Sequence, residues 1–272
     1  MTNADCCASS VVPGGSFQRN NVAPPGPMAT VSDFRLDIYD VTVARFRKFL
    51  AVYPGSKPSA GTGKNPKNSA DMGWDPAWDA SLPADQAALL SAVQCADIDG
   101  TFTPAAGANE TLPVNCADWY EAFAFCIWDG GRLPTDAELN NAASAGAEQR
   151  HYPWSNPPDS ELIDPSYAVY APNPPALPGG LAVVGSKSPK GDGKWGHADL
   201  AGNVWNWALD STGDLPLPAT CDDCAELTAT GLRIVRGGSY YLTATWALVS
   251  TPYNDDATHH NTTTGVRCAR AE

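Results

Sequence analysis

The sequence is poor in basic residues. Its 272 residues include 17 Lys and Arg against 30 Asp and Glu, which gives a formal net charge of −13. Proteins that bind nucleic acid or anionic membranes use clustered Lys and Arg to contact the phosphates. The composition therefore argues against both kinds of partner. An acidic surface also keeps a protein soluble without any partner.

Long apolar runs and several catalytic motifs are also absent. No stretch approaches the roughly 18 apolar residues of a membrane span, so we expect none. The first ten residues, MTNADCCASS, carry neither a basic segment nor an apolar core, so no signal peptide is expected within this sequence. GxSxG, a Walker loop and a GxGxxG between a strand and a helix are missing as well.

What is present indicates a packed but loop-rich protein. Hydrophobic residues make up 43% of the chain, and Gly and Pro number 24 each, which favours a core with much irregular structure. A loop is expected over residues 54–73. Short strands joined by long loops are expected from residue 198 onward, including the segments RIVRGGSY and TGVRCAR.

Three segments have the pattern of helices. Thr42 is the expected N-cap of the first, whose apolar face comprises Val43, Phe46, Phe49 and Leu50. A second helix is expected over residues 113–130, ended by Gly130, with an apolar face of Trp119, Ala122, Phe123, Cys126 and Ile127. Thr135 and Glu138 have the spacing of a capping box for a third.

The eight cysteines stand at positions 6, 7, 95, 116, 126, 221, 224 and 268. An even number is typical of disulfides formed in an oxidising compartment. The pair Cys221 and Cys224 also resembles half of a zinc site, but a second pair or histidines at suitable spacing do not follow. We therefore expect a disulfide role for this pair, with a metal site or free thiols as the alternatives.

Eight motifs in order carry a family resemblance. They are VPGGSF, YDVTVARFRKFL, PVNCADWYEAFAFC, GRLPTDAEL, YPW, DLAGNVWNW, VRGGSYY and GVRCA. Together they resemble the formylglycine-generating-enzyme, or sulfatase-modifying-factor, domain. The resemblance implies an α+β fold of the C-type-lectin-like kind with about three helices and few short strands. It implies a single domain over residues 11–270 after an N-terminal tail of residues 1–10.

The enzymes of this family hold copper(I) with two cysteines that follow RGGSY, and they oxidise a substrate cysteine with oxygen. The matching positions here are Leu242 and Ala247, which offer no soft ligand for copper(I). The resemblance therefore implies a scaffold without the copper chemistry, and no copper is expected. An oxidoreductase that uses other residues is the alternative.

The resemblance also implies a particular cysteine pair and a calcium site. The resemblance implies that Cys126 pairs with Cys268. Apart from the resemblance, we expect Cys95 to pair with Cys116, and Cys6 or Cys7 to pair with the 221/224 pair. The frame that holds calcium in the family corresponds to Asp199, Gly202, Val204 and Asn206. Oxygen ligands suit this hard cation, and the alternative is a hydrogen-bonded turn beneath Trp205 and Trp207. At a second calcium site of the family, Val169 replaces a side-chain ligand.

The segment RGGSYYLTATWALVSTPYNDDATHHNTTTGVRC, residues 236–268, has no Lys or Arg between Arg236 and Arg267. Its mixture of aromatic and small polar residues is the chemistry of a binding surface, and the resemblance places it where this fold faces its ligand. A solvated loop with locally packed aromatics is the alternative. The expected contact residues are Tyr240, Tyr241, Thr243, Thr245, Trp246, Tyr253, Asn254, Asp255, His259, His260 and Asn261, with Trp205 and Asn206.

These patterns predict a non-catalytic protein that binds a protein or glycan ligand. The segment is similar to the diversified segment in the variable proteins of diversity-generating retroelements. We expect an extracellular, cell-surface or periplasmic location, because disulfides form there.

Overall fold

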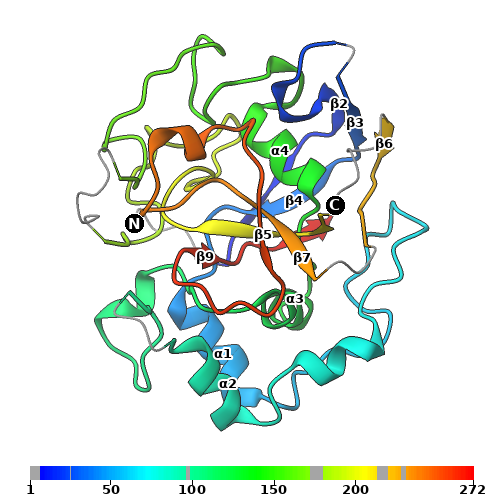
Figure 1. Ribbon diagram of the computed structural model, residues 1–272, viewed down its shortest axis with the longest axis vertical. Helices are drawn as coiled ribbons and strands as arrows, with labels where there is room; N and C mark the ends of the chain where they lie inside the picture. Colours follow the sequence, from blue (N-terminus) through cyan, green and yellow to red (C-terminus); the bar gives the residue numbers. More distant parts are fainter. Residues whose placement is uncertain (1–6, 25, 96–98, 172–179, 213–219, 228–230) are drawn as a thin grey trace.

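The structure is a computed structural model of the 272-residue chain and describes residues 7–24, 26–95, 99–171, 180–212, 220–227 and 231–272 (Figure 1). The α-helices of this part are α1 (Val43–Val52), α2 (Gln86–Val93), α3 (Trp119–Trp128) and α4 (Asp136–Ser144). The strands are β1 (Ser9–Val12), β2 (Gly15–Gln18), β3 (Met28–Val31), β4 (Phe34–Asp37), β5 (Trp205–Ser211), β6 (Thr220–Asp222), β7 (Leu232–Arg236), β8 (Tyr253–Asp256), β9 (Thr264–Gly265) and β10 (Ala269–Ala271). This is the loop-rich α+β fold that was expected.

The helix starts follow the predicted caps in two cases. The Thr42 side chain accepts a hydrogen bond from the Arg45 amide at the start of α1, and Thr135 with Glu138 forms the capping box of α4. The second predicted helix is shorter than residues 113–130. It begins at Trp119 because Cys116 has a φ of 62° and Asp118 has the extended backbone of an N-cap.

Helix α2 was not predicted, so the described part of the chain has four α-helices where about three were expected. Its N-cap is Asp85, whose side chain accepts a hydrogen bond from the Ala88 amide. The short segment that follows, QAALLSAV, buries only Leu89 and Val93. Two buried residues over eight positions are too weak a periodic signal to separate this helix from the loop before it.

The strands form three small sheets with the orders β8-β7-β5-β9, β1-β4-β10 and β2-β3-β6. The second of these brings the two ends of the described chain together, since β1 and β10 both pair with β4 in antiparallel register. Ser9 and Ser10 lie in β1. They therefore belong to this sheet, although the sequence placed them in an N-terminal tail of residues 1–10.

Strand β5 runs through the middle of the molecule (Figure 1), and all seven of its residues are buried. Trp207 and Leu209 pack in the same apolar cluster as α1, α2 and α3, whereas Ala208 packs in the cluster of β2, β3, β4 and α4. The Trp207 indole also donates to the Ala117 carbonyl at 3.0 Å, which joins β5 to the turn before α3.

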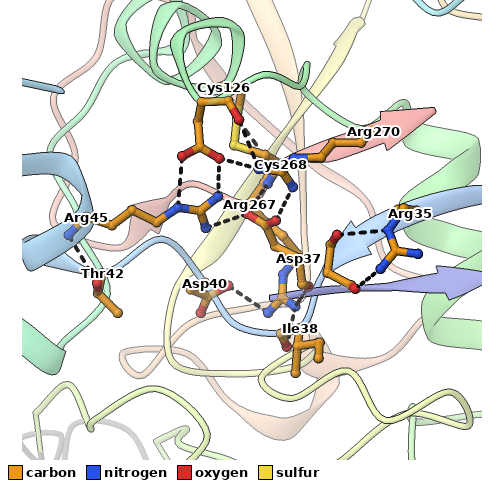
Figure 2. A network of polar contacts seen from close by, with 12 residues as sticks. Arg35, Asp37, Ile38, Asp40, Thr42, Arg45, Cys126, Arg267, Cys268 and Arg270 are labelled. Atoms are coloured by element: carbon orange, nitrogen blue, oxygen red, sulfur yellow. Dashed lines mark hydrogen bonds and ion pairs between the residues drawn. A yellow bond between two sulfur atoms is a disulfide. The ribbon is translucent and has the colours of Figure 1, made fainter. Parts of the chain in front are cut away.

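A buried network ties the last strand to the first helix (Figure 2). The Arg45 guanidinium of α1 lies 2.7 Å from the Asp37 carboxylate at the end of β4, and Arg270 of β10 contacts the same carboxylate. Arg267 donates to Asp40 at 2.8 Å, and both side chains are fully buried. Removing one member of such a pair would leave a buried charge without compensation.

Three disulfides are present among the described residues. Cys126 pairs with Cys268 and Cys95 pairs with Cys116, which confirms both predictions. Cys221 pairs with Cys224, so the predicted bond of Cys6 or Cys7 to this pair is wrong. A tight turn at Asp223, where φ is 45°, brings the two Cα atoms within 5.2 Å of each other. Cys6 lies outside the described residues.

The disulfides are typical of a protein that matures in an oxidising environment. Among the helices that the structure describes, none is both long and apolar enough to cross a membrane.

Candidate ligand-binding site

The segment of residues 236–268 leaves the central sheet at the end of β7 and returns to it through β8 and β9. Between β7 and β8 it forms a 3-10 helix, η5 (Ala244–Ala247). Gly238 makes this return possible. Its φ is +74°, and a Cβ atom there would lie 2.7 Å from the Trp246 carbonyl oxygen, so a side chain would push η5 away from the sheet.

A cavity of about 290 Å³ lies between this segment and the sheet. Its lining residues come from β5, β7, β8, β9 and the loops that join them. They are Trp205, Val235, Tyr241, Leu242, Trp246, Tyr253, Asp255, Asn261, Thr263 and Thr264. The strand pairing explains part of this set, because Val235 is opposite Tyr253 and Trp205 is opposite Thr264.

Aromatic rings form one side of the cavity. Trp205 and Tyr253 stack with their ring centroids 5.9 Å apart, and Trp246 stands at 78° to the first and 83° to the second. Trp205 is buried, whereas Tyr241 is 59% and Tyr253 48% exposed. Two large aromatic side chains are thus exposed beside the cavity, and one of them, Tyr253, stacks on the buried Trp205.

The acidic part of the lining is internally hydrogen-bonded. Asp255 Oδ1 accepts a hydrogen bond from the Asp256 amide at 2.9 Å and lies 2.8 Å from His259 Nδ1. Its Oδ2 accepts from the Asn261 amide group at 2.9 Å. Asn261 Oδ1 in turn accepts from the Thr263 amide and hydroxyl at 2.9 and 2.8 Å. This network fixes the carboxylate against the cavity without a ligand.

The structure brings six of the predicted contact residues together around the cavity: Trp205, Tyr241, Trp246, Tyr253, Asp255 and Asn261. The sequence reasoning did not predict Val235, Leu242, Thr263 and Thr264 as contact residues. These four residues reach the cavity because of the register of the short strands and the position of η5. The only signal in the sequence was the alternation of side chains between the two faces of the strands β7 and β8.

Other predicted residues lie apart from the cavity wall. Tyr240 is buried and donates its hydroxyl to Asp99 at 3.0 Å. Asn206 is also buried, and its side chain hydrogen-bonds Asp40 and Arg267. Thr243 and Thr245 hydrogen-bond each other through their hydroxyls at 2.9 Å. Asn254 is exposed on β8, on the strand face opposite that of its neighbours Tyr253 and Asp255.

The adjacent histidines face different carboxylates. His259 contacts Asp255, whereas His260 Nε2 lies 3.3 Å from Glu121 Oε2. In the described part of the chain, one group of three residues brings possible metal-ligand atoms within 4.8 Å of one another. The group consists of Asp118, Glu121 and His260. Asp118 and Glu121 are already bound to backbone amides as the capping box of α3, so the set acts as a helix cap with an ion pair.

This cap has perturbed acid–base properties. Burial, followed by repulsion from Glu121, raises the pKa of Asp118 to about 8. The hydrogen bond to Glu121 raises the pKa of His260. Both shifts keep a proton on the cluster in the folded protein.

The two positions that match the copper cysteines carry apolar side chains. Leu242 lies on the cavity wall, and Ala247 is buried at the end of η5 against Tyr152 and Ala201. Neither side chain has an atom that can bind a metal.

One of the expected calcium ligands, Asn206, already hydrogen-bonds a protein side chain. Asn206 Oδ1 accepts a hydrogen bond from Arg267 Nε at 2.9 Å, so a cation already uses the oxygen that calcium would need. Asp199 keeps a buried carboxylate, whose pKa burial and then repulsion from Asp40 raise to about 7. The buried Asp40 Oδ2 makes no hydrogen bond. Calcium at Asp199, Gly202, Val204 and Asn206 stays a prediction.

Comparison with known proteins identifies the family and the fold. The chain matches the model of the sulfatase-modifying factor enzyme 1-like domain over residues 2–272. It is 27% identical over 286 residues to the inactive C-alpha-formylglycine-generating enzyme 2 of Bos taurus, covering 95% of this chain and 86% of that protein. It is 28% identical over 258 residues to the formylglycine-generating enzyme of Thermomonospora curvata, covering 84% and 81%.

Two solved structures share the fold. PvdO from Pseudomonas aeruginosa superimposes with a TM-score of 0.67 at 19% identity, over 97% of this chain and 94% of that one. Treponema denticola variable protein 1 superimposes with a TM-score of 0.62 at 18% identity, over 97% and 95%. At these identities the likeness establishes the arrangement of the chain.

Proposed function

Because the chain belongs to the sulfatase-modifying factor enzyme 1-like domain family, we propose that it is a member that binds a ligand and lacks the copper chemistry. The ligand surface is the cavity beneath η5. The observation that carries the proposal is Leu242, which stands at the position of a copper cysteine and forms part of an aromatic cavity wall.

The remaining cysteines support this proposal. Copper(I) is held by soft sulfur ligands, and a cysteine binds metal as a thiolate. Six cysteines of the described chain are joined in three disulfides, and none of the six lines the cavity. These sulfurs are therefore unable to replace the missing pair while the disulfides persist.

The lining favours recognition of a protein or glycan partner. Tyr and Trp give a large contact area at low entropic cost, and Asn and Thr add adaptable hydrogen bonds. Treponema denticola variable protein 1 has the same fold, which is consistent with a variable protein of the retroelement kind. The disulfides favour action outside the cell or in the periplasm.

The test is a binding screen of a displayed peptide library and a glycan panel with the wild-type protein and with Tyr253→Ala. Removing an exposed ring from the cavity wall should weaken every bound ligand by about tenfold or more. Leu162→Ala, which truncates another exposed apolar side chain outside the cavity, should leave binding unchanged. Ligands that bind wild type and Tyr253→Ala equally would place the binding surface elsewhere.

The alternative is an oxidoreductase with relocated chemistry. Its support is the 28% identity to a formylglycine-generating enzyme across most of both chains. Consumption of oxygen with a cysteine-containing peptide separates the two functions, because binding alone consumes none.

A further inference from the structure

We propose that the cavity recognises a methylated ammonium group. This inference rests on the proposed function, because it names the chemical class of ligand for the same site. The argument combines the charge of the cavity, the hydrogen bonds already made within it and the arrangement of its rings.

The charge of the cavity is negative. Asp255 is the only acidic residue among those that line the cavity, and the lining contains no basic residue. No Lys or Arg occurs in the sequence between Arg236 and Arg267. The Asp255 side chain is 15% exposed, so solvent screens it less than a surface carboxylate. The whole chain adds a formal net charge of −13. Both the local and the overall charge therefore favour a cation.

The hydrogen-bonding capacity of this acidic side is largely used within the protein. Asp255 already has partners on both oxygens, from the Asp256 amide, His259 and Asn261. The Asn261 side-chain oxygen accepts two hydrogen bonds from Thr263. A primary ammonium that enters the cavity must find acceptors for three N–H groups, and leaving them unmade costs free energy. A quaternary ammonium has no N–H group and avoids this cost.

The remaining wall suits the methyl groups of such a cation. Trp246 stands nearly perpendicular to the stacked pair of Trp205 and Tyr253, so the rings present two orientations to the cavity. Val235 and Leu242 add aliphatic surface. Aromatic faces attract a cation through the ring quadrupole, most strongly when the cation is desolvated. A negative charge whose acceptors are largely occupied, together with aromatic and aliphatic walls, matches a methylated ammonium better than a sugar or an amine.

The test compares choline with 3,3-dimethylbutan-1-ol, in which carbon replaces the charged nitrogen at the same shape. Isothermal titration calorimetry at pH 8 on the full chain should show choline binding at least tenfold more tightly than its neutral counterpart. Ethanolamine, the primary amine, should bind more weakly than choline. Titrations with phosphocholine and with a trimethyllysine peptide then distinguish a headgroup from a protein as the source of the group.

Variants separate the proposed contacts from folding. Tyr253→Leu should lose most choline binding while Tyr253→Phe retains it, because only the ring face is needed. Asp255→Asn should reduce the preference for choline over the neutral alcohol. Thermal unfolding of each variant shows whether it is folded, and the Tyr253 pair remains informative should Asp255→Asn fail to fold.

Three outcomes would overturn the inference: equal affinity for choline and the neutral alcohol, tighter binding of ethanolamine, or no binding of choline to the wild type. If choline fails but the peptide or glycan screen yields ligands that depend on Tyr253, the proposed function stands without this inference. If the screen fails as well, both are wrong.

Discussion

At the residue scale, the proposal depends on Leu242 and Ala247, which the family resemblance places where the enzymes have sulfur ligands for copper(I). Leu242 contributes apolar surface to the cavity. Asn206 shows a similar exchange, because its side-chain oxygen accepts a hydrogen bond from Arg267. The permanently charged Arg267 guanidinium thus binds the Asn206 oxygen that was expected to be a calcium ligand.

The Asp118 side chain should make the stability of the protein depend on pH. Its pKa is raised from 3.8 to about 8 in the folded protein, so the folded state binds the proton more tightly than the unfolded state. This contribution to stability is complete below about pH 4 and is lost as the pH rises through about 8. Asp118→Asn keeps a good N-cap residue without the titrating group.

The variant should therefore match the wild type near pH 4, where both states of the wild type are protonated, and exceed its melting temperature at pH 9. A difference of a few degrees corresponds to about 1 kcal/mol in a chain of this size. Thermal unfolding followed by circular dichroism at both pH values measures it. Asp85→Asn, at the exposed N-cap of α2, is the matched control. A melting temperature of Asp118→Asn that stays below the wild type at pH 9 would contradict the account.

At the scale of elements, the sequence predicted those parts whose signals are local. Thr42 and Thr135 cap the helices they were expected to cap, because an N-cap depends on residues within one turn. The start of α3 was misplaced because the left-handed backbone at Cys116 is held by contacts from distant segments. One of these is the hydrogen bond of the Cys116 amide to the Asn261 carbonyl.

The candidate site shows the same division. Its aromatic and acidic members stand out in the segment after β7 because they cluster in sequence. Tyr240 and Tyr241 are adjacent and look equivalent in sequence, yet only Tyr241 reaches the cavity while Tyr240 is buried against Asp99. Which neighbour points outward depends on how η5 folds back over the sheet, and a single sequence holds no direct signal for that.

At the scale of the whole molecule, the chain is closed by contacts between its ends. The last strand pairs with β4, and the Cys126–Cys268 disulfide joins α3 to the residue before β10 over a separation of 142 residues. The pairing was predictable only through the family resemblance, because eight cysteines allow 105 complete pairings. Residues so far apart give no local signal of their contact.

The two kinds of disulfide should contribute differently to stability. In the chain-entropy model, closing the long loop contributes about 5 kcal/mol, whereas the Cys221–Cys224 bond, with a separation of 3 residues, contributes about 2 kcal/mol. Cys126→Ala with Cys268→Ala should therefore lower the free energy of unfolding by more than Cys221→Ala with Cys224→Ala. Urea titration of both double variants measures it, and equal losses would rule out this explanation.

The most direct test of a binding rather than oxidising role is a copper(I) titration, run side by side on the wild type and on Leu242→Cys with Ala247→Cys. The wild type should hold no stoichiometric copper and consume no oxygen with a cysteine peptide, while the double variant should gain about one copper(I) per chain through the restored thiolates. One copper per wild-type chain, with oxygen consumed as the peptide is oxidised, would contradict the account.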